Sequence, residues 1–422
     1  MTSTTPVPGR LLLLFAFIGA TSPLAVDLYL ASFPAIQEDL RTTPGMVQLT
    51  LTSYLVGVSV GQPLWGPVSE RLGRRQTLLA SSAATVVASL AVVLAPSAGT
   101  LVAARFVQAL AAAAGIVVAR AMIADLARGY DGLRALATMM TIHGLVPVVA
   151  PALGGLLATF LPWRGVLGVL AGVVVLQLLA ALLWVPETLP AARRSRRVEY
   201  GDLLRVARRP AYLTPALTLG LAVATMMAFV ACSPFVYQGL LGFPPLVYGL
   251  AFTLNALGMT AGGLVSARLA RRHVHPARTV ARALPVLVGA TLLVVAAGLS
   301  PRPVLLVAPM LLTAFCCNLV MGNCMGLAME EAHDLPGAGS AMLGLFMFGV
   351  SAGVTPLAAL LGDVRSAVPM GLLMTGTALA AGAVFTLGRL LAPGRSDGFA
   401  ATAAGPAGDP DHAAPLTLSA KV

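Results

Sequence analysis

Long apolar stretches alternate with short polar ones along almost the whole chain. A membrane-spanning helix needs about 20 predominantly apolar residues. Twelve stretches have a suitable length: 11–34, 46–66, 76–96, 99–124, 135–161, 165–186, 212–235, 246–267, 282–299, 303–328, 338–361 and 367–389. Several contain proline, which membrane helices tolerate because neighbouring groups satisfy the freed backbone polar atoms. The pattern predicts an all-α polytopic membrane protein with twelve transmembrane helices.

Composition supports this class. The 422 residues are 58% hydrophobic and 10% charged, whereas soluble domains are about 45–50% apolar and about 25% charged. These values exclude an ordinary soluble enzyme and a disordered chain. Arg10 followed by an apolar run resembles a signal peptide, but the run continues without a small-residue cleavage site, so we interpret it as the first span.

Basic residues are concentrated in alternate loops. If the N-terminus is cytoplasmic, inner loops and tails hold 21 basic residues and outer loops hold 4. This asymmetry predicts that both termini are cytoplasmic, and it explains the net charge of +11 without a nucleic-acid-binding surface. We expect an N-terminal tail, a six-helix half, an arginine-rich linker, a second six-helix half and a disordered tail, at residues 1–10, 11–186, 187–211, 212–391 and 392–422.

One loop sequence occurs twice. Gly66–Arg75 reads GPVSERLGRR and Gly263–Arg272 reads GLVSARLARR, with seven of ten positions identical at an offset of 197 residues. That offset is about six spans, so both copies lie on the same side of the membrane. The repeat predicts a parallel duplication of a six-helix unit.

The repeated loop resembles the signature loop of the major facilitator superfamily, usually written G-x-L-a-D-R-x-G-R-R/K. Further segments resemble its Bcr/CflA drug-resistance family, which includes bicyclomycin and chloramphenicol/florfenicol exporters: Asp27–Ile36, Arg105–Gln108, Ala119–Leu126, Pro186–Leu189, Ser233–Tyr237 and Ala338–Gly344. The resemblance implies a monomeric drug/proton antiporter in the lipid bilayer of a bacterial inner membrane. Its energy source would be the proton gradient, with no cofactor, metal site, nucleic-acid partner or enzymatic activity.

A few positions depart from the family pattern. Glu70 replaces the usual aspartate of the signature loop, and Ala109 and Ala31 replace a common glycine and proline. Ala150 precedes Pro151 where the antiporter motif of the fifth helix has glycine. The first and last of these changes bear on gating geometry rather than on the fold.

Two charged residues lie deep in predicted spans of the first half. Asp27 in the first span and Arg105 in the fourth lie at similar depth in the outer half, so the two side chains could face one another. A charge at the bilayer centre costs about 2.5–3.5 kcal/mol or more, which makes it a functional candidate. We expect Asp27 to be the protonation switch and Arg105 to tune its proton affinity, and by resemblance they match the family's coupling acid and motif arginine. The alternative is a static ion pair that fixes the two helices.

The resemblance also implies a cytoplasmic lock, formed by the first copy of the loop and the inner end of the fourth span. The second copy has lost the acid and one glycine (Ala267 and Ala270), so we expect the lock to be asymmetric. The alternative is a topology signal that keeps arginines inside. The predicted gating residues are Gly66, Glu70, Arg71, Gly73, Arg74, Arg75, Arg120 and Asp125, and the antiporter-motif helix contributes Pro147, Pro151, Gly154 and Gly155.

The second half offers aromatic, sulfur-containing and amide side chains that suit a lipophilic substrate. With polar residues of the first half, the substrate candidates are Tyr29, Tyr54, Gln108, Met227, Phe235, Tyr237, Asn255 and Phe346. Ordinary packing is the alternative for each of them. Other functions remain open: a dedicated exporter of one endogenous metabolite or self-made antibiotic, and a membrane sensor or scaffold in a transporter fold. A serine hydrolase motif at Ser59 or Ser351 lies mid-helix, outside the strand-turn-helix context that it needs.

Overall fold

The computed structural model describes residues 8–127, 129–194, 200–299, 304–360 and 366–391. Within these ranges every regular element is helical. The long helices of the first group are α1 (Gly9–Asp27), α3 (Pro44–Leu72), α4 (Arg74–Val93), α5 (Ala98–Leu126), α6 (Gly129–Phe160) and α7 (Trp163–Trp184). Those of the second group are α9 (Pro210–Pro234), α10 (Pro245–Arg271), α11 (Pro276–Gly298), α12 (Val304–Glu331), α13 (Pro336–Leu360) and α14 (Val368–Leu391).

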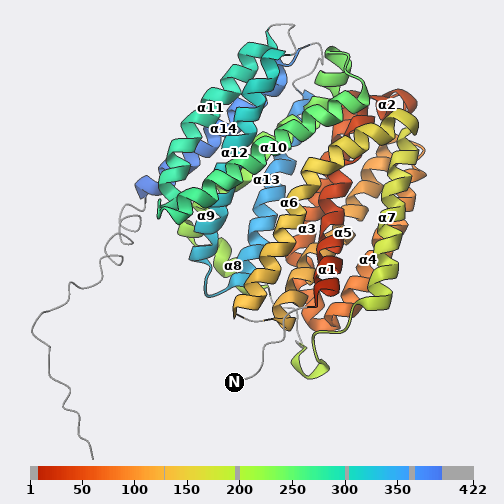
Figure 1. The fold of residues 1–422 in the computed structure, drawn as a ribbon, viewed down its shortest axis with the longest axis vertical. Helices are drawn as coiled ribbons and strands as arrows, with labels where there is room; N and C mark the ends of the chain where they lie inside the picture. Colours follow the sequence, from red (N-terminus) through yellow and green to blue (C-terminus); the bar gives the residue numbers. More distant parts are fainter. Residues whose placement is uncertain (1–7, 128, 195–199, 300–303, 361–365, 392–422) are drawn as a thin grey trace, which may run out of the picture.

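The two groups stand side by side, the first mainly on the right and the second mainly on the left of Figure 1. They meet where α3 packs against α13 and α6 packs against α10. Ser59 of α3 donates a hydrogen bond to the carbonyl of Leu345 in α13 at 3.0 Å. In α10, Thr253 donates to the carbonyl of Val148 in α6 at 2.8 Å. Direct helix-to-helix contact therefore joins the groups without a separate bridging domain.

The prediction of membrane-spanning helices is confirmed for eleven helices of the described residues, which are long and apolar enough to cross a membrane. The eleven do not include α3, whose 29 residues bury several polar side chains. The twelfth span therefore stays a prediction. Three helices are about six residues longer at one end than predicted: α3 ends at Leu72, α6 begins at Gly129 and α11 begins at Pro276. Backbone hydrogen bonding continues past the apolar core, and hydropathy does not register it.

The first predicted span, 11–34, is confirmed as part of the candidate span Gly9–Asp39, but it is not one continuous α-helix. Helix α1 ends at Asp27, a short 3₁₀ turn η1 covers Leu30–Ser32, and α2 (Phe33–Asp39) follows. Pro34 lies in the first turn of α2, where its missing N–H costs nothing. Residues 28–32 form the break between α1 and α2, and together with Phe33, the first residue of α2, we call them the break segment. It places a buried irregular stretch of backbone beside the second group.

The linker predicted at 187–211 contains helical structure. It includes the 3₁₀ turn η2 (Ala191–Arg193) and helix α8 (Gly201–Ala207), and α9 already begins at Pro210. Arg209 holds Asp334 through two hydrogen bonds of 2.6 Å, one to each carboxylate oxygen. This pairing lowers the pKa of the Asp334 carboxyl to about 2. The predicted tail at 392–422, most of the N-terminus and part of the linker lie outside the described residues.

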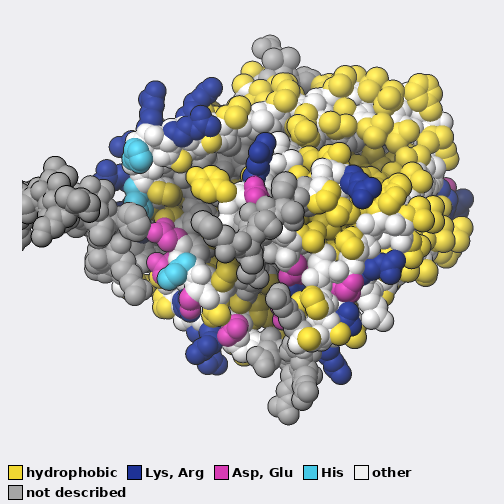
Figure 2. All heavy atoms as spheres, turned by 60° about the horizontal axis from the view of Figure 1, so that its bottom comes forward, with side chains coloured by type: hydrophobic (Ala, Val, Ile, Leu, Met, Phe, Trp, Pro, Cys, Tyr) yellow, Lys and Arg dark blue, Asp and Glu magenta, His cyan; other side chains and the backbone are white. Residues whose placement is uncertain are grey.

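One end of the bundle carries most of the charge. The junction between α3 and α4, the linker with α8, and the junctions α10–α11 and α12–α13 all lie there, and we call it the arginine-rich end. Arginine and acidic side chains gather on this end, while hydrophobic side chains cover the adjoining flank (Figure 2). The opposite end carries α2, and we call it the α2 end.

Candidate functional site

Asp27 lies at the last position of α1, immediately before the break segment, with 7% of its surface exposed. The break segment contacts the second group directly. Gln238 donates a hydrogen bond to the carbonyl of Ala31 at 3.1 Å, and the rings of Phe33 and Phe235 lie 5.9 Å apart. The carboxyl is therefore buried where α1 breaks and the two groups meet.

Arg105 of α5 is fully buried beside the end of α1. Its guanidinium donates to the Gln108 side chain at 2.7 Å and to the Ala25 carbonyl at 2.8 Å. It also lies between the rings of Tyr29 and Tyr54, 4.3 Å from each centroid. Carbonyls in the last turn of a helix lack partners within that helix, so Arg105 caps α1 where it ends. The two aromatic faces add cation–π stabilisation.

The alternative of a static ion pair between Asp27 and Arg105 is not seen in this arrangement. Among the described residues the two side chains form no ion pair, although they lie at similar depth. The donors of Arg105 are directed to Gln108 and to Ala25, two residues before Asp27. Gln108 in turn donates to Ser89 at 2.8 Å. Thus Tyr29, Tyr54 and Gln108, predicted as substrate residues, hold Arg105 in this structure.

Replacing Arg105 with lysine is expected to reduce transport by about tenfold or more, although the charge is kept. A lysine ammonium lacks the planar guanidinium, which donates to Gln108 and to Ala25 at the same time and stacks between the two tyrosine rings. Initial rates of drug uptake into inverted vesicles measure the effect. Arg278→Lys, at an exposed position in α11, is the matched control. If Arg105→Lys transports at the wild-type rate, only the charge at this position matters.

The loop between α3 and α4 is fixed by one arginine and two acids. Gly73 adopts φ +102°, a conformation that favours glycine. Arg74 donates through Nε to Asp125 at 3.1 Å and through its backbone N–H to Glu187 at 3.0 Å. Its Nη1 donates to Ser69 at 2.6 Å. The cluster ties the ends of α3, α4 and α5 to the chain that follows α7, all within the first group.

The composition of this cluster differs in part from the prediction. Arg75 takes part, because it donates to the carbonyls of Val185 and Leu182 at 2.9 and 3.1 Å. Glu70 and Arg71 are exposed and have no side-chain hydrogen bond within the described part of the chain. Glu187 supplies the acid expected from Glu70. It was missed as a site residue, although Pro186–Leu189 resembles a family segment.

Arg120 does not contact the loop as predicted. Its Nη1 lies 3.5 Å from the Ser340 hydroxyl of α13, at the limit of a hydrogen bond, and its Nη2 lies 3.9 Å from the sulfur of Met140. Arg120 therefore points from α5 towards the second group. The cause is position: Arg120 lies more than one helical turn before Asp125, on another face of α5.

The second copy of the loop uses amides where the first uses charges. Asn323 of α12 donates to Ser266 at 2.9 Å, and Asn318 donates to the carbonyl of Met259 at 2.6 Å. Ser266 occupies the same place in its repeat as Ser69. The two copies thus differ in chemistry, with an arginine–carboxylate cluster in the first group and neutral hydrogen bonds here.

Glycines allow α6 to approach α1 and α10 closely near the α2 end. A Cβ at Gly154 would overlap the carbonyl of Leu28 in the break segment. A Cβ at Gly155 would meet the carbonyl of Pro245, and one at Gly249 of α10 would meet the carbonyl of Pro151. Helix α6 continues through Pro147 and Pro151. The predicted antiporter-motif helix therefore packs backbone against backbone on both neighbours.

Aromatic side chains cluster in the second group beside the break segment. Phe235, Tyr237 and Asn255 are buried, while Met227 and Phe346 are half-buried. The ring of Tyr237 lies 6.2 Å from that of Tyr248, and the rings of Phe229 and Phe252 lie 5.3 Å apart. Phe229 and Phe252 belong to the aromatic inventory that the sequence offered for a lipophilic substrate. Tyr248 was missed, since nothing in an apolar run distinguishes this aromatic from a packing residue.

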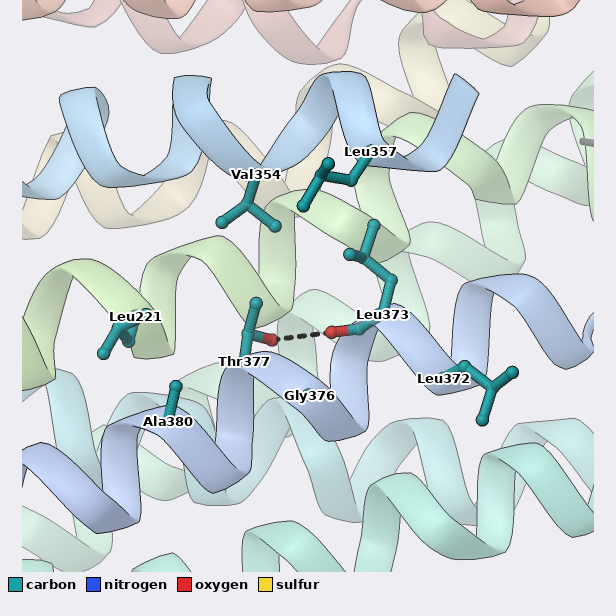
Figure 3. A pocket seen from close by; sticks show the side chains of 8 residues that line it. All are labelled: Leu221, Val354, Leu357, Leu372, Leu373, Gly376, Thr377 and Ala380. Atoms are coloured by element: carbon teal, nitrogen blue, oxygen red, sulfur yellow. Dashed lines mark hydrogen bonds between the residues drawn. The ribbon is translucent and has the colours of Figure 1, made fainter. Parts of the chain in front are cut away.

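Two cavities differ in character. One, of about 470 Å³, is lined almost entirely by apolar side chains of α9, α13 and α14, and the Thr377 hydroxyl is bonded to the Leu373 carbonyl (Figure 3). The other, of about 680 Å³, lies at the arginine-rich end and is lined from both groups, by residues such as Gln62, Arg120 and Ser340. The second cavity is the one that joins the two halves of the molecule.

Comparison with known proteins agrees with this architecture. The family model described as Major Facilitator Superfamily matches residues 15–356. A relative in Bacillus subtilis named uncharacterized MFS-type transporter YdgK is 32% identical over 372 residues, covering 87% of this chain and 92% of the relative. A bicyclomycin resistance protein homolog of Haemophilus influenzae is 26% identical over 369 residues, covering 85% and 91%.

The fold comparison is consistent with the family match. The crystal structure of the nucleoside transporter NupG superposes with a TM-score of 0.72 at 11% identity, covering 90% of this chain and 99% of that one. At this identity the match supports the fold alone. Family model, relatives and fold agree, and the chain belongs to the major facilitator superfamily of transporters, where its relatives include drug-resistance proteins.

Proposed function

We propose that this chain exports a moderately lipophilic drug or antibiotic in exchange for protons, by alternating access across a bacterial inner membrane. In this proposal α3 is the twelfth span and the arginine-rich end faces the cytoplasm. Asp27 takes up and releases the coupled proton. The drug-resistance relative supports a small-molecule cargo.

The position of Asp27 carries the proposal. Its buried carboxyl ends α1 at the break segment, which contacts the second group through Ala31 and Phe33. Movement of one group against the other therefore changes the solvation of this carboxyl, and solvation governs when a carboxyl binds a proton. A buried acid that no arginine neutralises in the described structure is free to exchange its proton in this way.

The two ends of the bundle support alternating access. At the α2 end, α6 packs closely on α1 and α10 through Gly154, Gly155 and Gly249. At the arginine-rich end, a cavity of about 680 Å³ separates parts of the two groups. Closure at one end with a cavity at the other is the arrangement of a transporter open towards the cytoplasm. The Arg74 cluster would hold the ends of α3, α4 and α5 together within the first group as that group moves.

Drug-driven proton movement in proteoliposomes tests the proposal. The purified full-length protein is reconstituted with an internal pH dye and exposed to chloramphenicol, a fluoroquinolone and a cationic dye. We expect at least one compound to move protons in the antiport direction, and a protonophore to remove the signal. Protein-free liposomes are the control.

A uniformly negative panel would contradict general drug efflux. If drugs move without protons, the proposed proton coupling is wrong, while the proposal of drug transport is supported. If neither drugs nor protons move, a dedicated exporter of one metabolite becomes the better interpretation, with a membrane sensor as the remaining one.

A further inference from the structure

The cavity at the arginine-rich end contains a cation that lacks a carboxylate partner. Arg120 is half-buried, and its Nε is enclosed without a hydrogen-bond partner among the described residues. Its two other contacts, 3.5 Å to the Ser340 hydroxyl and 3.9 Å to the Met140 sulfur, are weak. A buried guanidinium usually has charged or strong acceptors. The Nη1 and Nη2 donors of Arg120 are therefore available to a ligand in the cavity that this residue lines.

A helix begins in the wall opposite Arg120. Helix α13 starts at Pro336, and Pro336, Gly337, Ala338 and Ser340 all line the same cavity. Across the described chain the N–H groups of Gly337 and Ala338 have no backbone partner, since the first backbone bond of α13 is donated by Gly339 to Leu335. The first N–H groups of a helix bind anions because they lack partners and sit at the positive end of its dipole.

The acidic residues around the cavity are mostly neutralised. Asp334 is held by Arg209 through both carboxylate oxygens, and Asp202 lies 3.6 Å from Arg205. The other lining arginine, Arg74, is already bound to Asp125. Glu70 also lines the cavity and is exposed. Of the two arginines that line the cavity, Arg120 is thus the one without a carboxylate partner among the described residues.

We propose that the space between Arg120 and the first turn of α13 binds the oxyanion group of an amphiphilic organic anion. The guanidinium and the free N–H groups take the carboxylate or phosphate, and the Ser340 hydroxyl donates to it. Apolar side chains such as Val117, Ala121 and Met329 line the same cavity and take the hydrophobic part. Because the site joins α5 to α13, an anion there holds the two groups together at the arginine-rich end.

This site extends the proposed function, because it adds lipophilic acids to the compounds that enter from the cytoplasm. The route of the ligand to the site rests on that proposed function. Binding at equilibrium needs no proton gradient. Failure of the binding test would leave proton coupling at Asp27 untouched, and failure of coupling would leave the binding test valid.

Titration calorimetry of the purified full chain in an uncharged detergent tests the site. The probes are diphenylacetate, its neutral amide diphenylacetamide, and diphenylmethylammonium, which have the same hydrophobic part. We expect diphenylacetate to bind at least about tenfold more tightly than the other two, the size of one lost charge-assisted hydrogen bond. Equal binding of the acid and the amide would overturn the proposal.

Variants locate the binding. Arg120→Gln is expected to weaken diphenylacetate binding about tenfold, whereas Arg120→Lys retains most of it and Arg278→Gln, an exposed site at the same end, leaves it unchanged. Ser340→Asp places a carboxylate beside Arg120 and is expected to abolish binding, while Ser340→Asn does not. The Ser340 pair keeps the test decisive if Arg120→Gln does not fold. Undiminished binding in Ser340→Asp would refute the site.

Nanodiscs separate two sources of the anion. If phosphatidylglycerol in a phosphatidylcholine disc weakens diphenylacetate binding in wild type but not in Arg120→Gln, a lipid phosphate occupies the site. If it has no effect, the site takes a free organic anion. Both results keep the oxyanion site. Competition by phosphatidylglycerol that persists in Arg120→Gln would place the anion elsewhere.

Discussion

Asp27→Asn is expected to abolish drug-driven proton movement, reducing it to the level of protein-free liposomes. Asparagine has nearly the same shape as aspartate but neither binds nor releases a proton near neutral pH. The side chain lies at the end of α1 with 7% of its surface exposed, so the substitution leaves the surroundings in place. Proton movement and drug uptake, measured in the same proteoliposomes, check this result.

Drug exchange in the absence of a gradient separates coupling from folding. Exchange of labelled for unlabelled drug needs the conformational cycle but no net proton transfer, so Asp27→Asn should keep it. Stability should not fall either, because a charged carboxylate inside a bilayer costs about 2.5–3.5 kcal/mol or more. Glu38→Gln, an exposed carboxylate in α2, is the matched control. Proton coupling that survives in Asp27→Asn would show that another group carries the proton.

The hydropathy pattern predicted the helices well because burial in lipid leaves a strong signal. A run of about 20 apolar residues marks α4, α7 or α14 within a few residues of its observed ends. The break after Asp27 leaves no such signal, since Leu28–Phe33 are as apolar as the helix before them. Only Pro34 pointed to a new helical start, and proline occurs inside several other helices that continue unbroken.

Sequence reasoning found the charged residues of the site but not their partners. The depth of Arg105 could be counted along its span, whereas its contacts depend on rotamer and helix rotation. Its donors reach the Ala25 carbonyl, which is available only because α1 ends nearby. The predicted contact of Arg120 with the loop was wrong for the same reason. Its distance along α5 from Asp125 turns it away from the loop and towards Ser340.

The Arg74 cluster shows what a motif conveys and what it omits. The repeated loop supplied Gly73 and Arg74, and the family resemblance of the fourth span placed Asp125 beside them, where it pairs with Arg74. Glu187 joins them from the chain after α7, 113 positions away from Arg74. Such a contact depends on how α4 and α7 pack, which hydropathy does not encode.

Gly154→Ala is expected to open the α2 end in a larger share of molecules and to slow transport. The added carbon would overlap the Leu28 carbonyl in the break segment, so α6 and α1 must separate. Overpacking of this kind costs about 1–3 kcal/mol, and about 1.4 kcal/mol changes a population ratio tenfold. The added carbon destabilises the conformation in which the α2 end is closed. The equilibrium between the two conformations therefore shifts towards the one in which that end is open.

Cysteine labelling measures this shift. Ala31 lies in the break segment with 4% of its surface exposed, so Ala31→Cys should react slowly with a water-soluble maleimide. In combination with Gly154→Ala it should react about tenfold faster, as estimated from the same energy. Background from the four native cysteines, all buried, is subtracted.

The same helix offers the control for this experiment. A Cβ at Gly144 of α6 would meet nothing within 4 Å, so Gly144→Ala changes helix propensity equally without touching α1. The double variant Gly144→Ala/Ala31→Cys should then be labelled at the same rate as Ala31→Cys alone. If Gly154→Ala also leaves labelling unchanged, the break segment absorbs the added carbon locally. The close packing of α6 on α1 would then not control access at the α2 end, and closure there would depend on α6 and α10 alone.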